Sequence, residues 1–488
     1  MPVLRRVVPL LALLALLASG CGSKSSGSGL DSALQYVPKG APVVVAIDTD
    51  PAGDQWQQVD KLIGKFPFGG QVKQQFKSAF NARAGIDWDK DVKPLLGNDL
   101  VVAVTAASGP GTGTPFVAAW KVKDEATAKR LVEKNSSKIA PIEGADVYRT
   151  QSGNLTAFKD GTLVSARSEA DMTAALKRAG SGDHMTEQDF TDALGDLDDG
   201  ALVRITGNLQ ALLADPSAAA ARKVKWVSAL RTFGFTMAAQ SDGIELAFDV
   251  KTEGALQDSD LPLAAGSDSA PVVRRAGEVG IGLRNPAQIV TFAQTAAQLT
   301  DPAGYAKFKR KKATLAKQLG INIDRDVIGQ FTGNSAVSVA LNGDFAVRAD
   351  LRDPAAAEAT LKKAAPRLVK AAKGKSLGLS TPKNGKGFYA LAQANGKKVV
   401  FGVVGKTFVA ATDAARAAQF AGQSPSIVSG AKGALVLASD ARALANAIAT
   451  RQGQGTAGQI LTGALGDLIG SVESDASGLT GKLKLFIK

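Results

Sequence analysis

A pattern repeated at constant spacing is the feature that most constrains the fold of this 488-residue chain. The segment from Ala84 to Val104 corresponds to the segment from Leu319 to Leu341, in which five residues recur 235 positions later. The pairs are Gly85 and Gly320, Ile86 and Ile321, Asp89 and Asp324, Asp91 and Asp326, and Val92 and Val327. Weaker matches continue in the same order over roughly 220 residues, so we expect two halves that share one topology.

Within each half, short strands rich in Val and Ile are separated by helical stretches. Pro42–Asp48 and Glu278–Leu283 are expected to be first strands. Leu100–Ala106 and Phe116–Val122 are expected to form a hairpin, after which Asp124 is a predicted N-cap. Hairpins outnumber βαβ patterns, which predicts an α+β fold with two similar tandem halves, each a mainly antiparallel sheet with helices packed on it.

The N-terminus has the order of an export signal. Arg5 and Arg6 precede an apolar run from Val7 to Ala18, broken by Pro9, and small residues then lead to Cys21. As a helix, this run would span about 18 Å, less than the ~30 Å of a bilayer core. We therefore expect a cleaved signal peptide rather than a permanent membrane span.

The only cysteine of the chain stands where the signal would be cut. The segment from Leu17 to Cys21 resembles a bacterial lipobox, although Ala18 stands where Leu is usual. In such lipoproteins cleavage follows the residue at Gly20, and the thiol of the cysteine, here Cys21, carries a diacylglycerol. The alternative is an ordinary signal peptide with a chance cysteine. The Gly/Ser-rich run that follows suits a flexible tether, and acylation would hold the protein on the outer face of the cell membrane.

These patterns together predict the domain organisation. We expect a signal peptide at 1–20, the lipid-anchored cysteine and tether at 21–32, and a first α+β repeat at 33–253. A linker at 254–271 and a second, basic repeat at 272–488 complete the chain.

Two segments carry a family resemblance. The opening from Tyr36 to Gln55 and the motif from Asp91 to Gly97 resemble exported actinobacterial lipoproteins catalogued only as a domain of unknown function. Members typically show a Tyr-Val-Pro start and an Asp-Val-x-Pro-Trp-Leu-Gly motif, in which Leu95 here replaces Trp. The resemblance implies an extracytoplasmic, often lipid-anchored protein, and it supplies no catalytic residues.

The spacing of Asp87, Asp89 and Asp91 suggests a calcium loop but does not complete one. An EF-hand requires Gly at its sixth position and Glu at its twelfth, where this chain has Val92 and Asn98. We interpret the three carboxylates as acceptors for backbone N–H groups in a turn.

No other motif indicates chemistry. One cysteine and one histidine exclude a cysteine-based zinc or iron–sulfur site and any multi-histidine site. His184 lies in a loop without a nucleophile motif, and the glycines from Gly109 to Gly113 lack the ending of a phosphate-binding loop. We predict no catalytic residue, no metal and no cofactor.

Charge is distributed unevenly along the chain. Residues 21–264 carry 26 basic and 31 acidic side chains, whereas residues 265–488 carry 30 basic and 14 acidic ones, a net charge of +16. Since an exported protein rarely meets nucleic acid, we expect anionic lipid or a cell-wall polymer as the partner. The candidate contacts are Lys307, Lys309, Arg310, Lys311 and Lys312. The alternative is a solvated helix face.

Two classes of function follow. The first is a non-catalytic extracytoplasmic lipoprotein that acts as a binding, scaffold or envelope-maintenance module. The second is an extracytoplasmic enzyme whose residues meet only in the fold. The absence of catalytic motifs favours the first.

Overall fold

The computed structural model describes most of the chain. The described residues are 28–71, 74, 77–78, 81, 87–106, 114–371, 378–380, 388–392, 398–451 and 462–488. The predicted signal peptide, Cys21, Gly85, Ile86 and the segment Gly109–Gly113 lie outside them. No helix of the described residues is both long and apolar enough to cross a membrane.

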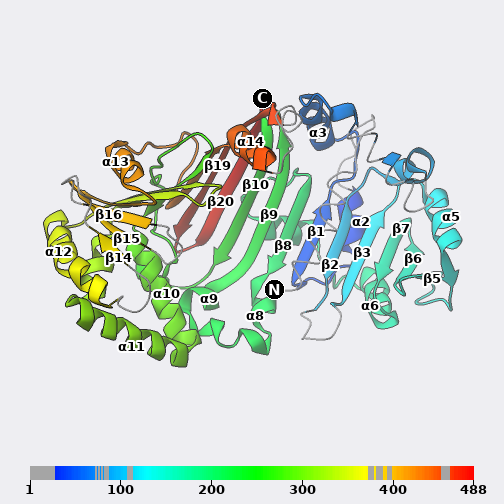
Figure 1. The fold of residues 1–488 in the computed structure, drawn as a ribbon. Coiled ribbons are helices and arrows are strands. Elements are labelled where there is room, and N and C mark those ends of the chain that lie inside the picture. The colour runs from blue at the N-terminus through cyan, green and yellow to red at the C-terminus, as the bar shows by residue number, and fades with distance from the viewer. Residues whose placement is uncertain are drawn as a thin grey trace. The chain divides into compact units, whose positions relative to one another are not determined.

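The chain forms two compact units (Figure 1). Unit 1 takes the described residues up to Pro216, with Arg231–Val250 and Ile487–Lys488. Unit 2 takes Ser217–Leu230 and Lys251–Phe486. The boundaries differ from the expected repeats at 33–253 and 272–488, because a short segment before residue 231 and the expected linker both belong to unit 2.

The first ten strands hydrogen-bond in one order. β9, β8, β1, β2, β3, β7, β6, β5 and β4 are successive antiparallel neighbours, and β10 pairs with β9. Their bounds are β1 Val43–Ile47, β2 Leu100–Val104, β3 Phe116–Lys121, β4 Ser136–Lys138, β5 Val147–Thr150, β6 Leu155–Lys159, β7 Thr162–Ala166, β8 Val203–Asn208, β9 Leu230–Gln240 and β10 Gly243–Thr252.

The last ten strands pair in the corresponding order. β19, β18, β11, β12, β13, β17, β16, β15 and β14 are successive antiparallel neighbours, and β20 pairs with β19. Their bounds are β11 Glu278–Arg284, β12 Asn334–Ala340, β13 Phe345–Asp350, β14 Gly378–Ser380, β15 Phe388–Ala392, β16 Lys398–Val404, β17 Thr407–Ala411, β18 Leu435–Asp440, β19 Leu465–Asp475 and β20 Gly478–Ile487. The α+β class with antiparallel pairing is confirmed, and duplication of an ancestral repeat stays a prediction.

Helices cover both faces of the strands in unit 1. Alternate residues of a strand point to opposite faces, so Val44 and Val45 of β1 enter different cores. Val44 packs with α2, α6 and α7, whereas Val45 packs with Trp56 of α3. The helices up to residue 213 are α2 Ser28–Leu34, α3 Asp54–Gly64, α5 Glu125–Asn135, α6 Glu169–Ala179, α7 Glu187–Leu194 and α8 Leu209–Leu213. The predicted N-cap of α5 is confirmed, since the Asp124 carboxylate accepts a hydrogen bond from Thr127 N.

Unit 2 has longer helices and fewer buried helical residues. Its helices are α9 Lys225–Ala229, α10 Pro286–Thr300, α11 Pro302–Leu319, α12 Pro354–Ala371, α13 Ala414–Gly422 and α14 Ala441–Arg451. The short turns of the chain are η1 Trp88–Val92, η2 Lys93–Leu95, η3 Pro216–Ala218, η4 Ala221–Lys223, η5 Asp258–Asp260, η6 Ile323–Val327 and η7 Ile328–Gln330. α13 buries Ala417 and Phe420, whereas α11 buries Leu319 alone along its 18 residues.

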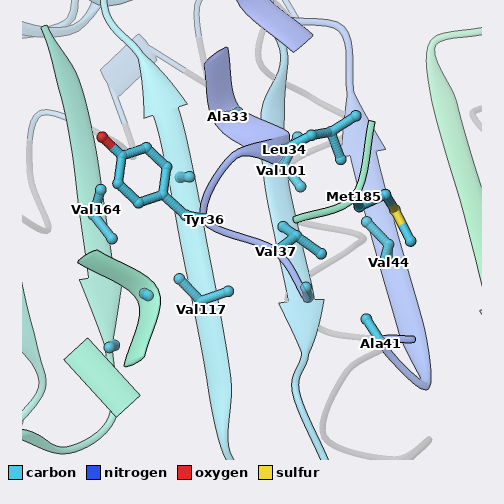
Figure 2. Close-up of a cluster of buried hydrophobic side chains, with 14 of the residues drawn as sticks. Ala33, Leu34, Tyr36, Val37, Ala41, Val44, Val101, Val117, Val164 and Met185 are labelled. Carbon is cyan, nitrogen blue, oxygen red and sulfur yellow. The ribbon is translucent and has the colours of Figure 1, made fainter. Parts of the chain in front are cut away.

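The largest core of unit 1 is closed by the segment that begins at α2. Leu34, Tyr36 and Val37 lie across the strands β1, β2, β3 and β7, as Figure 2 shows, and each is at most 1% exposed. The Tyr36 hydroxyl donates to Lys159 O, and burial raises the pKa of Tyr36 to about 12. The predicted flexible tether at 21–32 therefore extends too far, because the helix α2 already begins at Ser28.

The predicted linker is also packed rather than free. Leu261 and Ala270 are fully buried, and Leu261 lies in a cluster with Ala229 and Leu256. η5 forms within this segment, and Lys225 pairs with Asp260 at 2.5 Å between Nζ and Oδ2. Apolar residues of 254–271 thus belong to the core of unit 2, although the sequence predicts a linker here.

Candidate functional site

Helix α11 presents the basic segment that the sequence singled out. Its first turn is capped by Asp301, whose carboxylate accepts from Gly304 N at 2.9 Å. Its last turn ends at Gly320, which has a φ of 69°, a left-handed conformation that glycine adopts without steric cost. α10 and α12 lie beside α11 in unit 2 (Figure 1).

Four of the five candidate cations are accessible. Lys307, Lys309, Arg310 and Lys311 are all exposed, and none has an ion pair with a described acidic residue. Lys312 differs, because only 15% of its side chain is exposed and its ammonium lies 2.8 Å from Asp324 Oδ1. It also lies 5.6 Å from the centre of the Phe308 ring. Lys312 is therefore a structural residue and does not belong to the accessible basic surface.

The Asp-x-Asp-x-Asp segment forms a capped π-helical turn, η1. Asp87 Oδ1 accepts from Lys90 N at 2.9 Å, and Asp91 Oδ2 accepts from Asp87 N at 2.9 Å. Asp91 also pairs with Arg130 at 2.7 Å. The hydrogen bond from Arg130, together with that from Asp87 N, lowers the pKa of Asp91. The interpretation as backbone acceptors is confirmed for Asp87 and Asp91, whereas Asp89 pairs with the side chain of Lys77.

The same arrangement recurs in η6. Asn322 Oδ1 accepts from Arg325 N at 3.0 Å, and Asp326 Oδ2 accepts from Asn322 N at 2.8 Å. The ion pair between Lys312 and Asp324 has a counterpart 235 residues earlier, where Lys77 Nζ lies 3.1 Å from Asp89 Oδ1. The repeated acidic motif thus serves a repeated structural task.

Metal and histidine chemistry find no support in the described residues. No group of three or more His, Cys, Asp or Glu side chains among them is placed to hold a metal ion. His184 is half-buried rather than exposed, and its Nδ1 lacks a hydrogen-bond partner there.

A buried ionic cluster in unit 1 was not anticipated. Arg204 of β8 donates through Nη2 to Asp99, which precedes β2, and through Nη1 to Asp199 O at 2.9 Å. Asp48, which follows β1, belongs to the same cluster, and its Oδ1 accepts from Asp50 N at 2.7 Å. The carboxyl end of β1 and the amino ends of β2 and β8 meet here, because both neighbours are antiparallel to β1.

Burial controls the protonation of these carboxyls. Burial raises the pKa of Asp48 to about 6, helped by the nearby charges of Asp99 and Asp50 and opposed by the hydrogen bond from Asp50 N and by Arg204. Burial also raises the pKa of Asp99, although its contact with Arg204 acts in the opposite direction. The charge of the Asp48 carboxyl therefore changes near pH 6.

This cluster has no counterpart in unit 2. Matching strand order and register places Leu283 at the position of Asp48, Ser335 at that of Asp99 and Leu437 at that of Arg204. The strand order therefore does not require a buried ion pair at this place. The contacts of Arg204 with Asp99 and with Asp199 O join the start of β8 to the residue before β2, which is a structural task.

Sequence reasoning found the basic helix but missed two features. The cluster of Asp48, Asp99 and Arg204 joins residues up to 156 positions apart. The one signal for it in the sequence is that Asp48 ends a predicted strand and Asp99 directly precedes another. The second missed feature is apolar, because Phe308 and Leu315 of α11 are 47% and 41% exposed. Amphipathic spacing alone would have assigned both to a buried face.

Comparisons with known proteins identify the family of the chain but no relative of known activity. A family model described as a protein of unknown function (DUF3352) matches residues 6–389. No curated protein matches the sequence. Crystal form III of TP0453 is 11% identical with a TM-score of 0.28, and the match covers 46% of this chain and 81% of that one. Crystal form I is 12% identical with a TM-score of 0.26, and the match covers 46% and 80%. At these TM-scores the likeness is too slight to carry an argument.

Proposed function

The chain belongs to the DUF3352 family of proteins of unknown function, and from that premise we propose that it is a non-catalytic, lipid-anchored extracytoplasmic module that binds an anionic surface through α11. The observation that carries the proposal is the set of four exposed cations on one helix, at Lys307, Lys309, Arg310 and Lys311.

The charge of the surrounding sequence supports the proposal. Residues 265–488 carry 30 basic and 14 acidic side chains. Lys and Arg near an anionic surface contribute about 1 kcal/mol each, and the attraction fades beyond a Debye length of ~10 Å at 0.1 M salt. Four exposed cations could thus supply up to a few kcal/mol, enough for reversible binding at low salt.

The N-terminal sequence supports an anchor close to such a surface. Cys21 follows a short apolar run, and the residues up to Ser28, where α2 begins, are mainly Gly and Ser. A tether of this kind reaches roughly 5–6 Å times the square root of its length, which would keep the folded part close to the membrane. The anchor would therefore raise the effective concentration of α11 at the surface.

The test compares two fourfold charge reversals in the chain from residue 22 onward. One variant changes Lys307, Lys309, Arg310 and Lys311 to Glu. The matched control changes Arg352, Lys406, Lys432 and Lys482 to Glu, three lysines and one arginine that are also exposed and belong to unit 2. Both variants alter the net charge equally, so only the position of the charges differs.

Binding to vesicles that contain anionic phosphatidylglycerol is measured by co-sedimentation at low and high salt. We expect the α11 variant to lose binding at low salt, at least a hundredfold in affinity, and the control to retain most of it. Equal losses in both variants would mean diffuse attraction without a site, and no loss in the α11 variant would contradict the proposal.

A further inference from the structure

Two apolar side chains form a strip on the exposed surface of α11. Phe308 is 47% exposed and Leu315 is 41% exposed. At 3.6 residues per turn, positions seven residues apart are separated by only about 20° around the axis. The Phe308 ring contacts Tyr305 at 6.0 Å between centroids, and this contact leaves nearly half of the Phe308 side chain uncovered.

The cations of α11 are not equivalent with respect to this strip. Around the helix, Lys311 lies about 60° and Lys307 about 100° from Phe308 on one side. On the other side come the protein-facing residues Lys312 and Leu319, and Lys309 lies beyond them. Lys307 and Lys311 therefore adjoin the apolar strip, whereas Lys309 and Arg310 are separated from it.

α11 buries few of its own side chains for a helix of its length. Its only buried residue is Leu319, at the C-terminal end. Lys312 fixes the middle of the helix through Asp324 and also donates to Gln294 Oε1 of α10 at 3.3 Å. The strip formed by Phe308 and Leu315 thus borders the protein-facing side of the helix, next to Lys312 and Leu319, and stays partly exposed there.

We infer that α11 lies in the interface of an anionic bilayer, with Phe308 and Leu315 among the upper acyl chains and Lys307 and Lys311 at the headgroups. This inference rests on the proposed function and names lipid, rather than a wall polymer, as the partner. A hydrophilic polymer could neutralise the lysines but would offer nothing to the apolar strip, whereas a bilayer has an anionic surface directly above an apolar interior. An anionic bilayer therefore complements both the lysines and the exposed apolar side chains of α11.

The chain from residue 22 onward allows a direct test because it contains no cysteine. A single cysteine is placed at Phe308, Leu315 or Ala313 and labelled with the environment-sensitive dye NBD. Ala313 is exposed and lies about 140° from Phe308 on the same helix. With phosphatidylglycerol vesicles we expect a blue shift and stronger emission at 308 and 315, and no change at 313.

Two sets of variants complete the test. Phe308→Ser with Leu315→Ser should weaken binding to the vesicles about tenfold or more, and should leave binding to soluble polyphosphate unchanged. Lys307→Glu with Lys311→Glu should weaken vesicle binding more than Lys309→Glu with Arg310→Glu, which makes the same change in net charge. Circular dichroism verifies that each variant is folded.

The outcomes separate this inference from the proposed function. If the fourfold reversal abolishes binding but the dyes at 308 and 315 stay in water, the surface is bound by charge alone and the inference is overturned. An equal blue shift at 313 overturns the stated orientation. If the fourfold reversal has no effect, the proposed function itself fails. Binding to polyphosphate that is lost with Phe308 and Leu315 would point to a polymer site and also overturn the inference.

Discussion

The ammonium of Lys312 lies 2.8 Å from Asp324 Oδ1, and this ion pair joins the middle of α11 to the turn η6. The relationship recurs 235 residues earlier between Lys77 and Asp89, at 3.1 Å. Two ion pairs at one spacing place the repeated acidic motif in a structural role. They also explain why Lys312 differs from its exposed neighbours.

Replacing Lys312 by Met should loosen α11 without unfolding unit 2. The apolar stem is kept while the contact with Asp324 is lost, so we expect a cost of up to about 1 kcal/mol, because Asp324 is 58% exposed and screened by water. Hydrogen exchange followed by mass spectrometry should show faster exchange in α11. Lys309→Met is the control, and equal exchange in both variants would contradict the role of the ion pair.

The correspondence of the two strand orders can be tested by giving Arg204 and Asp99 of unit 1 the residues found at the matching positions of unit 2. Arg204→Leu alone leaves a carboxylate buried without its partner and should cost about 3–5 kcal/mol in free energy of unfolding. The double variant Asp99→Ser with Arg204→Leu installs the residues found at the corresponding positions of unit 2, Ser335 and Leu437. We expect it to regain at least half of the loss in urea unfolding. A double variant as unstable as the single one would contradict the correspondence of the two strand orders.

Asp48 should make the stability of unit 1 depend on pH. Its folded pKa is raised from 3.8 to about 6, so the folded state holds the proton more tightly than the unfolded state. The resulting stabilisation is fully present below pH ~3.8 and is lost as the pH rises through 6. Asp48→Asn keeps an oxygen for Asp50 N and does not titrate.

Relative to Asp48→Asn, the wild-type chain should therefore lose about 2 kcal/mol of unfolding free energy between pH 4 and pH 7. Urea unfolding of both proteins at several pH values measures the difference. A difference that stays constant over this range would show that Asp48 titrates normally.

Cys21 can be tested in the intact cell. If it carries the anchor, Cys21→Ser should release the protein from the membrane fraction or leave the signal uncleaved, because no other residue can be acylated at that point. Processing and membrane association that both survive the change would contradict a lipid anchor. Ser19→Ala serves as the matched control, since it lies beside the cleavage site and carries no thiol.

The sequence predicted local structure better than long-range assembly. The Val- and Ile-rich run before Asp48 became β1, and the capping role of Asp124 followed from its place before a helical stretch. These outcomes depend on neighbouring residues alone. α2 was missed because Ser28 and Gly29 are poor helix formers, and burial of Leu30 and Leu34 stabilises the helix instead.

The candidate site was predicted in part for a similar reason. A run of basic residues from Lys309 to Lys312 cannot be buried as a whole, so exposure of most of it followed from composition. Which lysine would face the protein could not be predicted, because that depends on where η6 places Asp324. The exposure of Phe308 and Leu315 was unpredictable in the same way, since it reflects which elements leave α11 uncovered.

The central claim is that α11 of the anchored protein contacts membrane lipid. The most direct measurement introduces the photoreactive amino acid p-benzoylphenylalanine at position 308 of the full chain, illuminates intact cells and identifies the adduct by mass spectrometry. We predict phospholipid adducts at position 308 and none with the same residue at position 313. Adducts with protein or polymer at position 308, or equal lipid adducts at both positions, would contradict the account.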